Sequence, residues 1–199
     1  MNRIVKLTVL LTSIMLLVML SISTSGQSNS SSKEEGLSAQ IKAKDEKQRV
    51  DRGLEIAPVT LNFRNKDRDL VGLGSYIVNA QAACADCHSC PTYAPGHNPF
   101  QGGDGQINAT NYLAGGVPFG PIISANITPD SSGKPAGLTF EEYRELIRTG
   151  HDPDEEDEIL QVMPWPIFRN MTDHDILAIY TYLSSIPHAE PGSCTGPGQ

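Results

Sequence analysis

Three of the four cysteines lie within one stretch of seven residues. In the segment Cys84-Ala-Asp-Cys87-His88, two thiols stand three positions apart and a histidine follows the second. This spacing, CxxCH, is the attachment signature of c-type haem. On a helix, each thiol can reach one vinyl group of the porphyrin, and His88 is then held under the iron as an axial ligand. The motif occurs once and predicts one covalently bound haem c, attached through thioethers at Cys84 and Cys87.

The same residue types also serve other kinds of site. A thioredoxin-like redox pair needs a βαβ context, which the surrounding sequence does not show. A zinc site could use the motif residues together with Cys90, but structural zinc sites usually pair one such cluster with a distant second one. A chance match to a short motif is the third alternative. Haem attachment agrees best with the amino-terminal sequence described next.

The amino terminus predicts export from the cytoplasm. Arg3 and Lys6 precede an apolar run from Leu7 to Ile22, and small residues follow. A basic start, an apolar middle and a small-residue exit are typical of a secretory signal peptide. The alternative is an uncleaved membrane anchor, although the apolar run is shorter than the roughly 20 residues that a span needs. We predict a signal peptide at 1–26 and a location in the periplasm or on the outer face of the membrane.

Haem iron held by His88 requires a second axial ligand if it is to be fully coordinated. Met163 lies in the segment Val-Met-Pro-Trp-Pro, a stiff loop that can aim a thioether at iron. Its alternative role is to fill a gap in the core. Met171 directly precedes a helix cap and fits better as a packing residue. The histidines outside the motif are the other candidates: His97, His151, His174 and His188. We predict Met163 as the ligand.

Charge and composition suggest how the rest of the chain is organised. The chain has 15 basic and 23 acidic residues and a net charge of −8, which argues against a nucleic-acid partner. Residues 27–56 are rich in Ser, Lys, Glu, Gln and Asp, and we expect a polar flexible linker that is disordered or weakly helical. Residues 57–199 are expected to form the folded domain and its carboxy-terminal tail.

Three helices are predicted to position the motif. The first spans Gly74–Ala83, and its small residues would let another helix approach closely. The other two begin at Thr139 and Thr172, each followed three residues later by an acid that completes a capping box. They are expected to end at Gly150 and Pro187.

A long loop separates the motif from the second helix. Residues 89–137 are rich in Gly, Pro, Asn and Asp and show no convincing periodicity. So long a loop inside a small domain needs something to fold around. Three helices with this loop make a thin protein core, which a large apolar haem would complete.

These segments, in this order, resemble a monohaem class I c-type cytochrome, and within that family the exported bacterial cytochrome c domains associated with dehydrogenases. The resemblance covers roughly residues 69–187, and its specific motifs are CxxCH and the Met163-Pro segment. Supporting segments are Gly74 and Tyr76, Leu113–Gly116, Asn126–Asp130, Thr139–Glu142 and Thr172–Asp175. The resemblance implies an all-α cytochrome c fold, in which helices and long loops wrap around one covalent haem and the first and last helices cross beside its edge.

The resemblance also implies an electron carrier without catalytic residues. Its iron would cycle between Fe(III) and Fe(II), and its partners would be redox proteins such as a dehydrogenase or a respiratory complex. With His88 and Met163 both bound, the iron has no vacant site for a substrate. The alternative is a haem enzyme or a gas or redox sensor with a labile sixth ligand.

Two expectations concern the surroundings of the haem. His88 should donate its second ring N–H to a carbonyl of the proline-rich loop that follows it, near Pro91, Pro95 or Pro99. Trp165 and Arg169 could reach a haem propionate, with packing and solvent exposure as their alternative roles.

The chain departs from the family pattern at two further cysteines. Cys90 and Cys194 are left over from the haem motif and could pair in an oxidising compartment. Closing a loop of about 100 residues would stabilise the fold by roughly 4–5 kcal/mol in the chain-entropy model. Two free thiols are the alternative.

A second departure is an acidic run, with six carboxylates among the seven residues 152–158. Its simplest interpretation is a solvated loop. A docking patch for a basic surface on a redox partner is the sharper hypothesis, because opposite charges steer association. Calcium binding is a weaker one, because the run lacks the spacing of an EF-hand loop.

Overall fold

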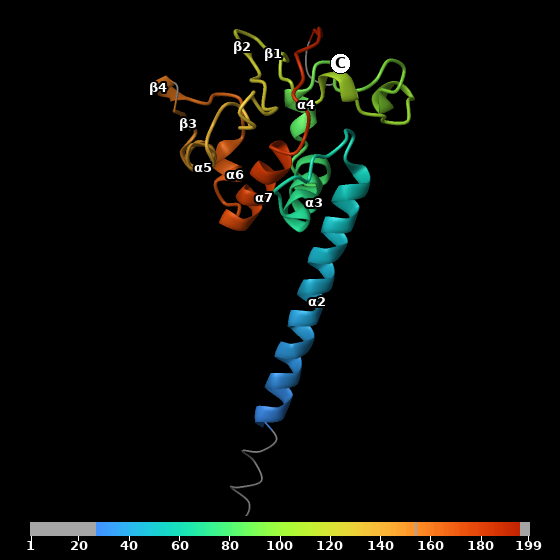
Figure 1. Cartoon of the computed structure of the whole chain (residues 1–199), viewed down its shortest axis with the longest axis vertical. Helices are drawn as coiled ribbons and strands as arrows, with labels where there is room; N and C mark the ends of the chain where they lie inside the picture. The colour runs from blue at the N-terminus through green and yellow to red at the C-terminus, as the bar shows by residue number, and fades with distance from the viewer. Residues whose placement is uncertain (1–26, 154, 196–199) are drawn as a thin grey trace, which may run out of the picture. The chain divides into compact units, whose positions relative to one another are not determined.

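The computed structural model describes residues 27–153 and 155–195 (Figure 1). The chain divides into two units, which meet between Asp45 and Glu46 inside helix α2 (Gln27–Ile56). All the other helices and strands that the structure describes belong to the second unit. The predicted signal peptide at 1–26 lies outside the described residues. Among those described, no helix has the length and apolar character that crossing a membrane requires.

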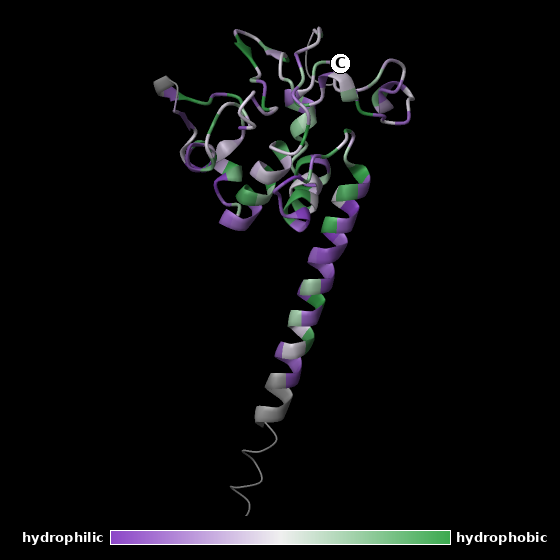
Figure 2. Ribbon diagram, viewed as in Figure 1, coloured by the Kyte–Doolittle hydropathy of each residue, from purple (hydrophilic) through white to green (hydrophobic). Residues whose placement is uncertain are grey.

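Residues 27–56, for which we predicted a polar linker that is disordered or weakly helical, form helix α2. It is one helix of 30 residues, and Figure 2 shows its last turns becoming apolar after a largely polar stretch. Val50 is buried, and Leu54 packs against the core four residues later. Because these two residues share one helix face, the chain joins the domain from Glu46 onward rather than from Ala57. The polar composition of the whole segment concealed this short apolar face.

Helix α3 (Arg68–Tyr76) begins earlier than the predicted start at Gly74. Asp67 caps it, because its carboxylate accepts the backbone N–H groups of Asp69 and Leu70. The chain continues without a break into a π-helix, η1 (Ile77–Gln81). The prediction placed the start too late because a single Asp before a mixed sequence is a weak cap signal.

Helix α3 crosses helix α7 (Asp173–Leu183) at backbone contact. A Cβ atom built on Gly74 would lie 1.9 Å from the carbonyl oxygen of Ala178, far inside any real contact distance. The expectation that small residues in the first helix allow a second helix to approach closely is therefore confirmed.

Helices α5 (Phe140–Thr149) and α7 begin as predicted. In both, a threonine accepts a backbone N–H from the acid three residues on, and the acid accepts the threonine's own N–H. Gly150 ends α5 in the left-handed conformation, with φ at 77°. Helix α7 ends at Leu183, four residues before the predicted stop at Pro187.

Short strands supplement the helices, so the domain is mainly helical rather than strictly all-α. Strand β1 (Pro118–Phe119) pairs antiparallel with β2 (Ile122–Ile123), and β3 (His151–Asp152) pairs with β4 (Glu155–Ile159). The 89–137 loop also contains two 3₁₀ turns, η2 (Pro99–Gln101) and η3 (Ala109–Asn111). Strands of two residues carry no readable alternation, so the sequence did not reveal them.

The second hairpin contains most of the acidic run. Asp152 lies in β3 and residues 155–158 lie in β4, where we expected a solvated loop. The side chains of residues 154–157 are outside the described part of the structure. The docking role of the run stays a prediction.

A buried network of hydrogen bonds ties five segments together. The hydroxyl of Tyr112 donates to Asn79 Oδ1 at 2.5 Å, and the amide of Asn79 donates to the oxygens of Ser75 and Tyr182 at 3.0 to 3.2 Å. Ser75 in turn donates to the carbonyl of Gly53 at 2.6 Å. Since the Tyr112 proton is used on Asn79, the 2.9 Å contact between the two tyrosine oxygens is donated by Tyr182. The network joins α2, α3, η1 and α7 to the long loop.

Replacing Tyr112 by phenylalanine should destabilise the domain through this network. The change removes one hydroxyl and leaves Asn79 Oδ1 without its buried donor, which costs about 1–3 kcal/mol. Urea denaturation measures this loss. Tyr93→Phe is the matched control, because Tyr93 is half-buried outside the network. Equal stability of the two variants would contradict the importance of the network.

Candidate functional site

The CxxCH motif forms its own short helix, α4 (Cys84–His88). Ala83 precedes it in the left-handed conformation, with φ at 50°, which turns the chain sharply after η1. One helical turn places Cys84 and Cys87 on the same side of α4. Both are free thiols, whereas the other two cysteines are paired. Both motif sulfurs are thus available for thioether bonds.

The surroundings of Cys84 are those of an apolar attachment point rather than a reactive thiol. Burial, reinforced by the nearby Cys87, raises the pKa of the Cys84 thiol to about 12. Burial also raises the pKa of Cys87. Cysteines of thioredoxin-like redox pairs show the opposite shift. The structure therefore gives no support to the redox-pair alternative.

The zinc alternative also loses a ligand. Cys90, which would have completed a set of four, is bonded to Cys194. Throughout the described parts of the chain, no three or more His, Cys, Asp and Glu residues are grouped so as to hold a metal ion. The motif thus lacks the donor set of a structural zinc site.

His88 is oriented by a carbonyl that sequence reasoning did not find. Its Nδ1 lies 2.8 Å from the carbonyl oxygen of Ala125, not near Pro91, Pro95 or Pro99 as predicted. A carbonyl can only accept, so Nδ1 carries the proton and Nε2 presents its lone pair for a metal. Burial lowers the pKa of His88, although this hydrogen bond opposes the effect. The ring is therefore set up as a neutral ligand.

The long loop folds back far enough to explain this correction. The backbone N–H of Gly115 donates to the carbonyl of His88 at 2.7 Å. Gly115 also lies against Ala125, where a Cβ on the glycine would approach within 2.5 Å of the Ala125 backbone. The loop thus brings residues from nearly forty positions downstream against α4. No local pattern in the sequence predicts this contact.

Met163 lies between the acidic hairpin and helix α6 (Trp165–Phe168). It is half-buried and packs against the hydrophobic core, as do Cys84 and Met171. Its carbonyl accepts the backbone N–H of Trp165 at 2.8 Å, which fixes the loop at the prolines. Met163 therefore remains the predicted ligand, with a side chain that shares the apolar core with a motif cysteine.

The alternative histidine ligands are hydrogen-bonded or exposed. Nδ1 of His97 bonds Asp104 at 2.7 Å, and both ring nitrogens of His188 contact oxygen atoms of other residues. His151 and His174 are exposed. Met163 stays the predicted ligand, and these four histidines stay the alternatives.

Trp165 packs inside the domain. Its indole N–H donates to the carbonyl of Leu160 at 3.2 Å, and its ring lies against Gly150, where a Cβ would come within 2.4 Å. Arg169 is exposed, and its carbonyl accepts a hydrogen bond from Arg148. Packing is thus observed for Trp165 and solvent exposure for Arg169, and contact with a propionate stays a prediction for both.

These residues fit a covalently bound haem. The motif supplies two unpaired thiols on one helical turn and an imidazole whose Nε2 is free for iron. The core beside Cys84 and Met163 is built from large apolar side chains, including Leu113, Leu138 and Tyr143. A haem c with His/Met ligation uses two thiols for attachment, and one imidazole and one thioether for the iron. This site offers all four groups beside apolar side chains.

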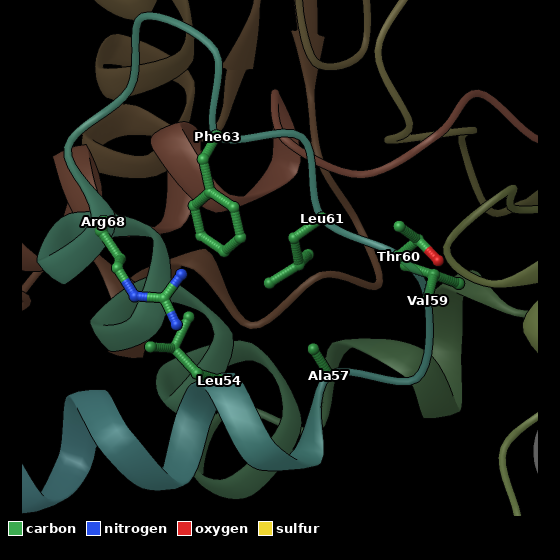
Figure 3. Close-up of a pocket in the computed structure, with 7 residues that line it drawn as sticks. All are labelled: Leu54, Ala57, Val59, Thr60, Leu61, Phe63 and Arg68. Carbon is green, nitrogen blue, oxygen red and sulfur yellow. The ribbon is translucent and has the colours of Figure 1, made fainter.

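A pocket of about 280 Å³ lies elsewhere in the second unit (Figure 3). Its walls come from the end of α2, the segment that follows, and the start of α3. The lining residues are Leu54, Ala57, Val59, Thr60, Leu61, Phe63 and Arg68. The Arg68 guanidinium sits 4.6 Å from the ring centroid of Phe63. The pocket contains none of the predicted site residues and is no part of the haem site.

The cysteines outside the motif form a disulfide, one of the two alternatives considered. Cys90 is fully buried, and its Cα lies 5.5 Å from that of Cys194, 104 residues later. The bond ties the carboxy-terminal tail to the residues just after α4. Sequence reasoning missed the polar residues that hold the same tail, Asn111, Asn126 and Thr128. Their only signal is the frequency of asparagine in a Gly- and Pro-rich loop.

Comparisons with known proteins find similarity to cytochrome c subunits of bacterial dehydrogenases. Over 113 residues the chain is 31% identical to the cytochrome c subunit of gluconate 2-dehydrogenase from Pantoea cypripedii, covering 57% of this chain and 22% of the relative. Over 120 residues it is 34% identical to the cytochrome c subunit of the quinone alcohol dehydrogenase from Gluconacetobacter polyoxogenes, covering 58% and 22%. The chain is related to the cytochrome c subunits of bacterial dehydrogenases.

Another match extends this relationship to a further dehydrogenase. The chain is 32% identical over 137 residues to one of the subunits of nicotinate dehydrogenase from Pseudomonas putida, covering 66% of this chain and 10% of the relative. No protein-family model matches the chain. The chain spans about a fifth of the length of the cytochrome c subunits it matches.

Proposed function

We propose that this chain is an electron carrier that holds one haem c covalently through Cys84 and Cys87, with His88 and Met163 as axial ligands. When bound, the haem supplies a reversible one-electron couple between Fe(III) and Fe(II). The observation that carries the proposal is the single turn of α4, in which two free thiols precede an imidazole whose Nδ1–H is already engaged by Ala125.

Each residue has a defined role in this proposal. Cys84 and Cys87 retain a flat apolar cofactor in a domain whose own core is small. His88 is held in one tautomer, so its Nε2 lone pair would be available to the metal. Met163 would supply the second ligand, and its thioether would favour Fe(II) over Fe(III) relative to a second nitrogen ligand. With both ligands bound, the iron would have no position for a substrate, so the residues would support transfer of electrons and not bond chemistry.

The proposed partner is a dehydrogenase or a respiratory complex outside the cytoplasm. The relatives are named as cytochrome c subunits of a gluconate dehydrogenase and quinone alcohol dehydrogenases. Residues 1–26 have the composition of an export signal, and a disulfide agrees with an oxidising compartment. Acidic residues 152–158 would face a basic surface on the partner.

Replacing Met163 by alanine tests the axial assignment. The oxidised protein should lose the methionine–iron charge-transfer band while it keeps its covalent haem, because the sixth ligand alone is removed. Met171→Ala is the matched control, since Met171 is equally half-buried against the same core and should leave the band unchanged. If the band survives in Met163→Ala, Met163 is not the ligand and another methionine supplies the thioether. If the wild-type protein never shows the band, His/Met ligation is wrong and the sixth site is open or held by a nitrogen ligand.

A further inference from the structure

The carboxy-terminal residues 188–195 form a strap that runs from the end of α7 back to the loop after α4 (Figure 1). The disulfide anchors its far end at Cys90. Gly192 lies so close to Cys90 that a Cβ atom on the glycine would fall 2.0 Å from the Cys90 carbonyl oxygen. Asn111 donates to the carbonyl of Glu190 at 2.8 Å. The strap is thus packed and hydrogen-bonded along its length, as well as crosslinked.

The near end of the strap is bonded to the segment that follows Ala125. Asn126 Nδ2 donates to the carbonyl of Ala189 at 2.8 Å, and the N–H of Ala189 donates to Thr128 Oγ1 at 3.3 Å. Asn126 Oδ1 accepts both the N–H and the hydroxyl of Thr128, at 2.9 and 2.6 Å. Thr128 is buried. The strap and the 126–128 turn therefore form one rigid polar contact.

That contact lies directly beside the residue that orients His88. The Ala125 carbonyl, one position before Asn126, accepts the Nδ1–H of His88. On the other side, the N–H of Ile127 donates to the carbonyl of Leu113 at 3.0 Å. The two residues that follow Ala125 are thus held, one by the strap and one by the loop, next to the carbonyl that accepts from His88.

We propose that the disulfide-anchored strap positions His88 through Asn126 and the Ala125 carbonyl, and so sets the strength of the axial imidazole. The inference rests on the proposed role of His88 as a haem ligand. Asn126 is a positioning residue, because it acts on the ligand only through Ala125. A hydrogen bond from the distal ring N–H to a fixed acceptor raises the basicity of a metal-bound imidazole. A more basic imidazole stabilises Fe(III), so loosening the strap raises the reduction potential.

The variant Asn126→Ser tests this chain of contacts. Serine can still accept the Thr128 N–H in a similar turn but is too short to reach Ala189. We expect the Fe(III)/Fe(II) equilibrium to shift toward Fe(II) by about threefold, which corresponds to about 30 mV at 59 mV per tenfold change. We also expect faster solvent exchange of the His88 Nδ1 proton, measured by NMR. Asn62→Ser is the matched control, because Asn62 caps the same kind of turn through the Arg64 N–H.

A second variant, Cys90→Ala with Cys194→Ala, releases the strap without touching Asn126. It should raise the potential in the same direction, and adding Asn126→Ser to it should raise the potential by less than the sum of the two effects. If both variants melt at lower temperature but keep the potential and the proton exchange rate of the Asn62→Ser control, the strap only stabilises the fold and the inference is wrong. A wild-type protein without covalent haem would overturn the proposed function instead, and the inference with it.

Discussion

Serine at both Cys84 and Cys87 is expected to abolish covalent haem binding and, with it, the reversible redox activity of the protein. A hydroxyl does not form the thioether bond, and no other free cysteine lies in the described parts of the chain to replace it. Without the cofactor, the loop at 89–137 loses the group around which we expect it to fold. Haem staining after denaturing electrophoresis measures attachment, and circular dichroism measures what remains of the fold.

The variant Cys90→Ala with Cys194→Ala is the control for this loss. It removes the same number of sulfur atoms, but none of them lies in the motif, so covalent haem should be retained. Haem that survives denaturation in the Cys84→Ser/Cys87→Ser protein would show that the motif is not the attachment site. Loss of haem in both double variants would instead show that haem attachment also requires the disulfide.

Alanine at Gly74 should cause a large loss of stability in the domain. Its Cβ would lie 1.9 Å from the carbonyl oxygen of Ala178 and 2.7 Å from Tyr182 Cβ, so the two helices must separate. We expect the free energy of unfolding to fall by about 3 kcal/mol, the upper end of the usual cost of overpacking. Helix propensity alone would favour alanine over glycine by about 1 kcal/mol. A loss of stability on Gly74→Ala would therefore come from the helix contact and not from helix propensity.

Gly36→Ala provides the comparison for this measurement. Gly36 also lies within a helix, but a Cβ there meets nothing within 4 Å. Chemical denaturation of the holoprotein should show no loss of stability for this variant. If Gly74→Ala unfolds at the same denaturant concentration as Gly36→Ala, the close crossing of α3 and α7 does not stabilise the domain.

Local signals explain most of what could be read from the sequence. The capping boxes at Thr139 and Thr172 work through residues only three positions apart, so both helix starts were predicted correctly. The small residues near Gly74 correctly predicted a close contact between two helices. The CxxCH motif likewise needs a single helical turn, and the structure provides it at α4.

Two structural features were not predicted because only a few residues in a polar stretch indicate them. Val50 and Leu54 form too short an apolar face to outweigh the composition of residues 27–56, so the helix there was taken for a linker. Asp67 was overlooked as a cap because the turn that follows it has no clear apolar period. Two-residue strands gave no pattern at all.

The sequence by itself predicted the chemistry that we propose for this protein: which residues could attach a haem and which could bind its iron. It also predicted where helices α5 and α7 begin. Only the tertiary structure decided what surrounds those residues. It placed Ala125 rather than a nearby proline-loop carbonyl against His88, and it brought Asn126 and Cys90 under the carboxy-terminal strap. The reason is physical. Ligand identity and helix caps depend on neighbours within one turn, whereas the partner of a buried N–H is whichever carbonyl the packed loop brings within 3 Å.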